Sequence, residues 1–181
     1  MAYTHKHYVG LTTQAPYAAV VVRRHFSGKI ICGFATQSER SLQEVLDELK
    51  AWLKKEFGPS WLKTGVIALI EDSEAGIAMA DMAENAIPLG WSTVYASAEV
   101  TRQALEAVLR VQGPATAKLQ IDEHSPRARE LAQALDAKAE GGMYDALALC
   151  VYQAKEDGDF RGDDVKVISN WGEDEERRFG R

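Results

Sequence analysis

Glu71 stands at a position where a carboxylate can do chemistry. It comes directly after the apolar run at residues 66–70 and is followed by Asp72. The run has the composition of a strand buried on both faces, and ligands of open α/β sheets bind beyond the carboxyl ends of such strands. Two interpretations are open. Glu71 is a functional acid at this edge, or it belongs to a helix cap, since Asp72 and Ser73 are both competent N-caps.

Asp145 is the second candidate, because it is the only charged residue between Glu140 and Lys155. An unpaired carboxylate buried in such an apolar stretch costs several kcal/mol. We therefore expect a partner for Asp145, which is a cation, a hydrogen-bond donor or a helix terminus. The helix dipole is the structural alternative to a functional role, because Asp145 follows the chain break at residues 141–142 by less than one turn.

The elements that must position these acids follow from local patterns. Short runs rich in Val, Tyr and Ala predict three strands joined by tight links, at residues 7–11, 17–23 and 29–35. Such links favour an antiparallel meander. A capping box at Ser41 and Glu44 opens an amphipathic helix that ends at Gly58-Pro59.

Strands and helices alternate in the rest of the chain. After the strand at residues 66–70 we predict helices at 73–86, 98–111, 126–139 and 143–155, with a short strand at 91–96. Three consecutive strands followed by alternation predict a mixed sheet with helices on its faces. The acidic, aperiodic residues 156–181 are expected to form a tail, with a strand at 165–169.

Four segments in this order carry a family resemblance. Residues 8–13 (YVGLTT) stand where the family's first strand has G-I-D-P-G, and residues 66–71 (VIALIE) match a strand that ends in I-E. Residues 94–100 (VYASAEV) and 144–149 (YDALAL) resemble v-x-Y-x-P-x-x-V-K and A-D-A-L-A-x. Over about residues 7–155 the chain resembles the RNase H-like superfamily, and within it the RuvC-type Holliday junction resolvases. The nuclease module of phage large terminases shares this core.

The resemblance implies a fold and an assembly. The fold is α/β, an RNase H-like mixed five-stranded sheet of three antiparallel strands followed by parallel strands, with helices on both faces. The domain would span residues 1–155 and the tail residues 156–181. RuvC-type enzymes are dimers, so a homodimer is implied, and the small-residue helix at 75–86 is its candidate interface.

The resemblance also implies a divalent-metal site for Mg²⁺ or Mn²⁺. Glu71 and Asp145 would be the catalytic residues and metal ligands, with Asp72 as a further ligand. In the family one ion activates a water and the other stabilises the leaving oxygen of the scissile phosphate. Two positions depart from the family pattern. Thr12 replaces the acid that bridges both metals, and Gly142 replaces a second acid one helical turn before Asp145.

Two principal hypotheses of function follow. The first is a RuvC-like, metal-dependent, structure-selective DNA endonuclease of DNA recombination, a hydrolase with a weakened active site. The second is a catalytically inactive RNase H-like module that serves as a nucleic-acid or protein-interaction adaptor. A third is a related α/β domain without a nucleic-acid role, in which both acids are helix caps.

Charge and composition add expectations about partners. The net charge is −6, but residues 1–65 carry +4, residues 66–155 carry −6 and residues 156–181 carry −4. Two interpretations are open: this distribution is ordinary charge scatter with Arg23 and Arg24 at a solvated hairpin end, or branched or double-stranded DNA meets the first third and Arg23 and Arg24 are the candidate contacts. No apolar run approaches ~18 residues, and the two cysteines lie in apolar segments, so we expect a cytoplasmic protein without a membrane span or disulfide.

Overall fold

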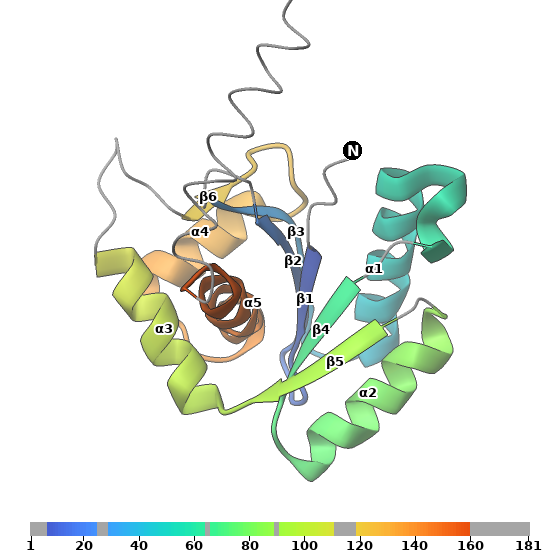
Figure 1. The fold of residues 1–181 in the computed structure, drawn as a ribbon, viewed down its shortest axis with the longest axis horizontal. Helices are drawn as coiled ribbons and strands as arrows, with labels where there is room; N and C mark the ends of the chain where they lie inside the picture. Colours follow the sequence, from blue (N-terminus) through green and yellow to red (C-terminus); the bar gives the residue numbers. More distant parts are fainter. Residues whose placement is uncertain (1–6, 25–28, 64–65, 89–90, 111–118, 160–181) are drawn as a thin grey trace, which may run out of the picture.

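The protein is a mixed sheet covered by helices on both faces (Figure 1). The computed structural model describes residues 7–24, 29–63, 66–88, 91–110 and 119–159. The strands are β1 (His7–Leu11), β2 (Tyr17–Arg24), β3 (Ile30–Ser38), β4 (Val66–Glu71), β5 (Trp91–Ala96) and β6 (Leu119–Ile121). The helices are α1 (Leu42–Phe57), α2 (Glu74–Ala86), α3 (Ala98–Arg110), α4 (Ala128–Ala137) and α5 (Gly142–Asp159), and the 3-10 helix η1 (Gly58–Lys63) follows α1.

The strand order is β5-β4-β1-β2-β3-β6. Strand β2 is antiparallel to β1 and β3, whereas β4 pairs parallel with β1 and β5 pairs parallel with β4. This arrangement confirms the predicted mixed sheet, an antiparallel meander followed by parallel strands. The sixth strand, β6, pairs parallel with β3 and was not predicted. Its three residues are too few to carry a periodic pattern.

Two hydrophobic cores lie on opposite faces of the sheet. Alternate residues of one strand face opposite sides, so Tyr8 of β1 joins one core whereas Val9 and Leu11 join the other. The Tyr8 side is covered by α3, α4 and α5, and the other side by α1 and α2 (Figure 1). Burial on both faces explains why β1, β2 and β4 are almost wholly apolar.

Helix α5 is central, because it packs on the sheet and also contacts α3 and α4. Gly10 of β1 permits the close crossing, since a Cβ there would lie 2.0 Å from the carbonyl oxygen of Ala146. Enclosure on several sides accounts for the apolar sequence of α5. Within the described ranges, no helix combines the length and apolar composition that a bilayer crossing requires.

Most predicted boundaries agree with the structure. Ser41 caps α1 by accepting the backbone N–H of Glu44, and Ser73 caps α2 in the same way. Helix α4 begins two residues after Pro126, because Arg127 adopts a left-handed conformation at the N-cap. Helix α5 continues to Asp159 instead of ending at residue 155, and Tyr8 donates a hydrogen bond to Asp157 on this extension. The strand predicted at residues 165–169 lies outside the described residues.

Candidate active site

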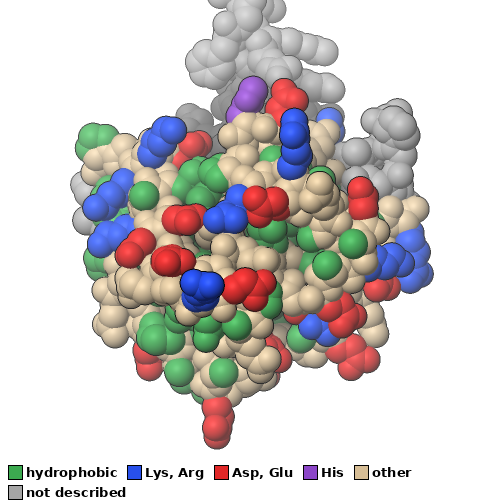
Figure 2. All heavy atoms as spheres, turned by 180° about the vertical axis from the view of Figure 1, so that it is seen from behind, with side chains coloured by type: hydrophobic (Ala, Val, Ile, Leu, Met, Phe, Trp, Pro, Cys, Tyr) green, Lys and Arg blue, Asp and Glu red, His purple; other side chains and the backbone are tan. Residues whose placement is uncertain are grey.

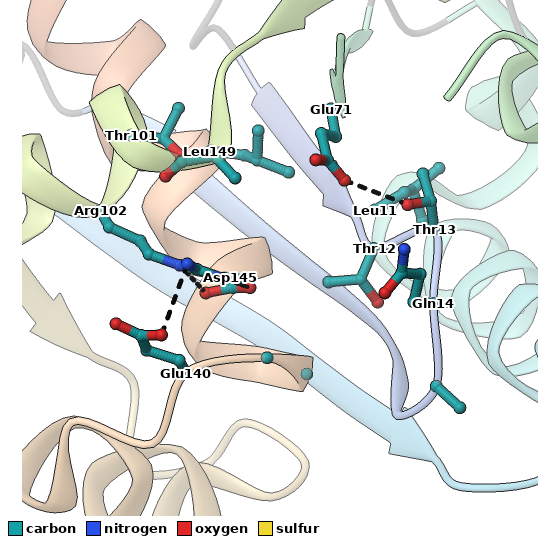
Figure 3. A pocket seen from close by; sticks show the side chains of 14 residues that line it. Leu11, Thr12, Thr13, Gln14, Glu71, Thr101, Arg102, Glu140, Asp145 and Leu149 are labelled. Atoms are coloured by element: carbon teal, nitrogen blue, oxygen red, sulfur yellow. Dashed lines mark hydrogen bonds and ion pairs between the residues drawn. The ribbon is translucent and has the colours of Figure 1, made fainter. Parts of the chain in front are cut away.

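Both predicted acids line one open pocket of about 300 Å³. The pocket lies where β1 and β4 end and where α3 and α5 begin (Figure 3). The polar side chains that line it are Thr12, Thr13, Gln14, Glu71, Thr101, Arg102, Glu140 and Asp145. The parallel pairing of β1 with β4 places both strand ends at one edge of the sheet, which is where a ligand site is expected.

Asp145 is paired with Arg102 of α3. Arg102 Nε donates to Asp145 Oδ1 at 2.9 Å, and Arg102 Nη2 donates to Asp145 Oδ2 at 2.7 Å (Figure 3). The two parallel bonds form a bidentate fork, which is the strongest common geometry between arginine and a carboxylate. Both carboxylate oxygens of Asp145 are bound by this one cation. The Asp145 side chain is only 19% exposed, so the ion pair is partly shielded from water. The partner expected for Asp145 is therefore a cation.

Glu140 adds a second, weaker contact to the same guanidinium. Its Oε2 lies 3.4 Å from Arg102 Nη1, and its side chain is 67% exposed. The hydrogen bonds from Asp145 raise the pKa of Arg102 above its usual value, and the nearby charges of Glu140 and Glu71 act in the same direction. Arg102 is thus a permanent cation among three pocket carboxylates.

Glu71 occupies the predicted position at the end of β4. Its Oε2 accepts a hydrogen bond from the hydroxyl of Thr13 at 3.2 Å (Figure 3). Asp72, the predicted additional metal ligand, is exposed and does not line the pocket. The N-cap of α2 is Ser73, which accepts the backbone N–H of Gly76, so neither acid is needed as that cap.

Thr12 holds the turn between β1 and β2. Its hydroxyl oxygen accepts the backbone N–H of Ala18 at 2.8 Å and donates to the carbonyl oxygen of Pro16 at 3.2 Å. The hydroxyl thus acts as both donor and acceptor within its own turn. A carboxylate could accept the Ala18 N–H, but it would meet the Pro16 carbonyl with two oxygens and no proton.

Gly142 stands at the other position where the family pattern has an acid. It has a positive φ of 52°, and a Cβ there would lie 2.1 Å from Gln37 Oε1. Gln37 Oε1 is held by the backbone N–H of Met143, which donates to it at 3.1 Å. A longer side chain here would require the Gln37 side chain to move, and it would need a backbone conformation that residues other than glycine adopt rarely.

These observations allow a test of the implied pair of divalent metal ions. Mg²⁺ requires several hard, charged oxygen ligands. Asp145 is occupied by Arg102, Thr12 is committed to its turn, and Gly142 has no side chain to offer as a ligand. Among the residues that the structure describes, no group of three or more His, Cys, Asp or Glu side chains is arranged to hold a metal ion. The residues as they stand do not fit a two-metal site.

Arg23 and Arg24 lie away from the pocket. They end β2, and Arg23 pairs with His7 at the beginning of β1, whereas the pocket is at the end of β1. Four residues of extended strand separate the beginning of β1, where Arg23 lies, from the end of β1 at the pocket, which corresponds to about 13 Å. Arg23 is exposed and Arg24 is partly exposed. The predicted DNA contacts and the predicted catalytic acids are therefore not brought together.

Arg102 is the residue that sequence reasoning missed. It lies in the second turn of α3. It also directly follows Thr101, which is buried against the core. A cation bordering the buried face of a helix was the available signal for a specific carboxylate partner.

Comparisons with known proteins give similarities of fold alone. No protein-family model and no curated protein sequence matches the chain. The yeast mitochondrial Holliday junction resolvase Ydc2 is similar in structure, with 9% identity over 93% of this chain and 86% of that chain and a TM-score of 0.45. The structure of T. thermophilus RuvC in complex with a Holliday junction substrate is also similar, with 14% identity over 80% of this chain and 90% of that chain and a TM-score of 0.37.

Proposed function

We propose that this protein is an RNase H-like module that binds branched or double-stranded DNA without cutting it by two-metal chemistry. The observation that carries the proposal is the bidentate bond between Arg102 and Asp145. The acid that matches the family's last catalytic position is neutralised by a side chain of the same protein. This proposal corresponds to the second of the two sequence hypotheses.

The charge of the pocket supports the absence of two-metal hydrolysis. Three carboxylates and one guanidinium line it, so it holds a formal charge of −2. Two divalent ions would add a charge of +4 beside the arginine. The ions would repel each other and the guanidinium, and few carboxylate oxygens are free to bind them. The positions of Thr12 and Gly142 supply no further charge.

DNA binding is assigned to the other end of the sheet. Acidic and basic side chains are interspersed on the face that Figure 2 shows, so the described surface there is not a continuous basic coat. Arg23 and Arg24 are adjacent cations at a strand end, and arginine binds phosphate well. They remain the proposed phosphate contacts, independent of the pocket.

The proposed module is a homodimer in the cytoplasm. Helix α2 buries Gly76, Met79, Ala80 and Ala83 inside its own subunit, while Ile77 and Met82 are exposed. These two apolar side chains support α2 as the interface between two copies, because exposed apolar surface on a helix is a common place for association.

A second candidate is the active endonuclease, with Glu71 and Asp145 as catalytic residues and Mg²⁺ or Mn²⁺ bound. One observation favours it. Three carboxylates line one pocket, those of Glu71, Glu140 and Asp145. If Arg102 moved away, the pocket would keep these three carboxylates without their cation.

A labelled four-way junction tests the proposal. Binding and cleavage are measured in EDTA, Mg²⁺ and Mn²⁺ for the wild type, for Asp145→Asn and for the double variant Arg23→Gln/Arg24→Gln. We expect binding in EDTA and no cleavage with either metal. The double variant should bind more weakly and lower the slope of log K against log salt by about 2, because each phosphate contact contributes ~0.9.

Two outcomes would contradict the proposal. Metal-dependent cleavage by the wild type that is lost in Asp145→Asn would establish the endonuclease instead. A wild type that binds neither the junction nor linear duplex would remove DNA as the partner and leave the protein adaptor.

A further inference from the structure

Arg23, one of the two proposed DNA contacts, lies on the side of the sheet that α1 covers. It is paired with His7 across β1 and β2, and directly opposed residues of antiparallel strands place their side chains on one face, with Cβ atoms about 5 Å apart. The ring of His7 contacts the ring of Phe57 in the last turn of α1, with 4.9 Å between the centroids. The exposed Arg23 is therefore a near neighbour of the end of α1.

Helix α1 brings further cations to this end of the molecule. It runs back from the end of β3 to the end of the sheet where β1 begins (Figure 1). Its last turn carries Lys54 and Lys55, and both side chains are exposed. The amine of Lys54 lies 5.2 Å from the centre of the Trp61 ring in η1. Arg23, Lys54 and Lys55 together form the basic end of the α1 side.

The charges of α1 are separated along its length. Glu44 and Glu48 in its first half accept hydrogen bonds from side chains in the last part of β3. Glu56 is the acid that stands beside the two lysines, and its side chain is exposed. Residues 50–57 carry three lysines and one glutamate, a net charge of +2. The second half of α1 therefore complements an anion.

The aromatic side chains beside the basic end favour a ligand that is bound through its phosphates. Phe57 packs edge to face against both His7 and Trp52, and the ring of Trp61 is approached by Lys54. All three rings of α1 and η1 are partly buried. Rings packed in this way are poor platforms for the stacking of unpaired bases. The backbone of duplex DNA presents phosphates outward, so it suits the basic end.

We propose that Arg23, Lys54 and Lys55 form a surface that binds the phosphate backbone of duplex DNA, at the end of the sheet opposite the pocket. The inference rests on the proposed function and deepens it, because it names two further contacts and the side of the sheet on which the duplex lies. Lys54 and Lys55 also offset the negative end of the α1 dipole, a role that does not depend on DNA.

The test measures the binding of a short fluorescent duplex to the full chain in EDTA, by anisotropy at several salt concentrations. Lys54→Gln/Lys55→Gln should bind roughly tenfold or more weakly than the wild type near 0.1 M salt. It should also lower the slope of log K against log salt by about 2, because each phosphate contact contributes ~0.9.

Two further variants separate this surface from the general charge of the protein. Lys155→Gln is the matched control, because Lys155 is also an exposed helical lysine but belongs to α5, and it should change the affinity by less than about twofold. Glu56→Gln removes the negative charge beside the two lysines, and it should bind the duplex more tightly than the wild type.

Melting temperatures establish that each variant is folded, because Lys54→Gln also loses its contact with the Trp61 ring. Lys55→Gln alone leaves that contact in place and should lower the salt slope by about 1. This single variant decides the question if the double variant does not fold.

The inference is overturned if the folded lysine variants bind the duplex as the wild type does, or if Lys155→Gln weakens binding equally. The proposed DNA function survives that result when Arg23→Gln/Arg24→Gln still binds more weakly. A wild type that binds neither duplex nor four-way junction overturns both. Polyglutamate is the competitor that tests an acidic protein as the occupant, and displacement of the duplex as effective as that by unlabelled DNA would refute the inference.

Discussion

Asp145 and Glu140 contact the same arginine, but their environments differ. The Arg102 side chain is 32% exposed and that of Asp145 is 19% exposed, so their fork is partly shielded from water. The Glu140 side chain is 67% exposed, and its contact is a single long one. Exposed ion pairs contribute little to stability, whereas a sheltered hydrogen bond to a charged group contributes more.

Asp145→Asn should therefore destabilise the metal-free protein. One hydrogen bond loses the negative charge of its acceptor, and the amide nitrogen faces a donor of Arg102. We expect the free energy of unfolding to fall by about 1.5–3 kcal/mol in urea denaturation. The matched variant Glu140→Gln, which removes the same charge at the exposed contact, should lower it by less than about 1 kcal/mol. A higher melting temperature for Asp145→Asn would show that repulsion among carboxylates outweighs the fork.

At the scale of elements, the crossing of β1 and α5 sets the geometry of the pocket. Gly10 brings the strand against the backbone of Ala146, which immediately follows Asp145. The sulfur of Cys150, one turn later, donates to the carbonyl oxygens of Tyr8 and Val20. The position of Asp145 relative to Thr12 and Glu71 thus depends on backbone contact between a strand and a helix.

Gly10→Ala is the prediction at this scale. The new Cβ would lie 2.0 Å from a backbone oxygen, so the helix must move, and we expect a loss of at least about 2 kcal/mol in unfolding free energy. Gly33→Ala on β3 is the control, because its Cβ would meet only the Trp52 ring at 3.6 Å, an ordinary contact. It should change stability by less than about 1 kcal/mol. Equal effects of both substitutions in chemical denaturation would contradict the close crossing.

At the scale of the whole molecule, the core under α5 contains both cysteines. Cys32 of β3 and Cys150 of α5 are fully buried, and both thiols are free. Burial raises the pKa of Cys32 to about 12 and raises the pKa of Cys150 well above its usual range. Both thiols are therefore neutral in the folded protein at pH values where an unfolded thiol, with a pKa of about 8.5, ionises.

Because the thiols react only when they are exposed and ionised, their alkylation reports the opening of this core. At pH 8–9 we expect negligible alkylation of the folded protein and rapid reaction of both thiols in denaturant. The sign for stability follows from proton binding. Between a pH of about 8.5 and about 12 the folded state holds thiol protons that the unfolded state releases, so this contribution to stability is complete below that window and falls as the pH rises. Rapid alkylation of either thiol without denaturant, measured by mass spectrometry, would show that this core opens locally.

The elements were predictable because their signals are local. Ser41 and Ser73 cap helices as their sequence context indicates, and the apolar run before Glu71 forms a central strand. Glu71 could be placed at the sheet edge that lines the pocket for the same reason, since a strand end is visible in the sequence. The short strand β6 could not be predicted, because pairing with β3 and not its own pattern makes it a strand.

The sequence by itself determined the order of elements, the mixed class of sheet and the need of Asp145 for a partner, because periodicity, caps and the cost of burying charge act over a few residues. Only the tertiary structure decided which partner Asp145 takes, since Arg102 lies 43 residues earlier in the chain. It also decided that a side chain at position 142 would meet Gln37, because Gln37 comes from the neighbouring end of β3. Contacts between side chains distant in sequence depend on how strands and helices cross, and no local pattern encodes those crossings.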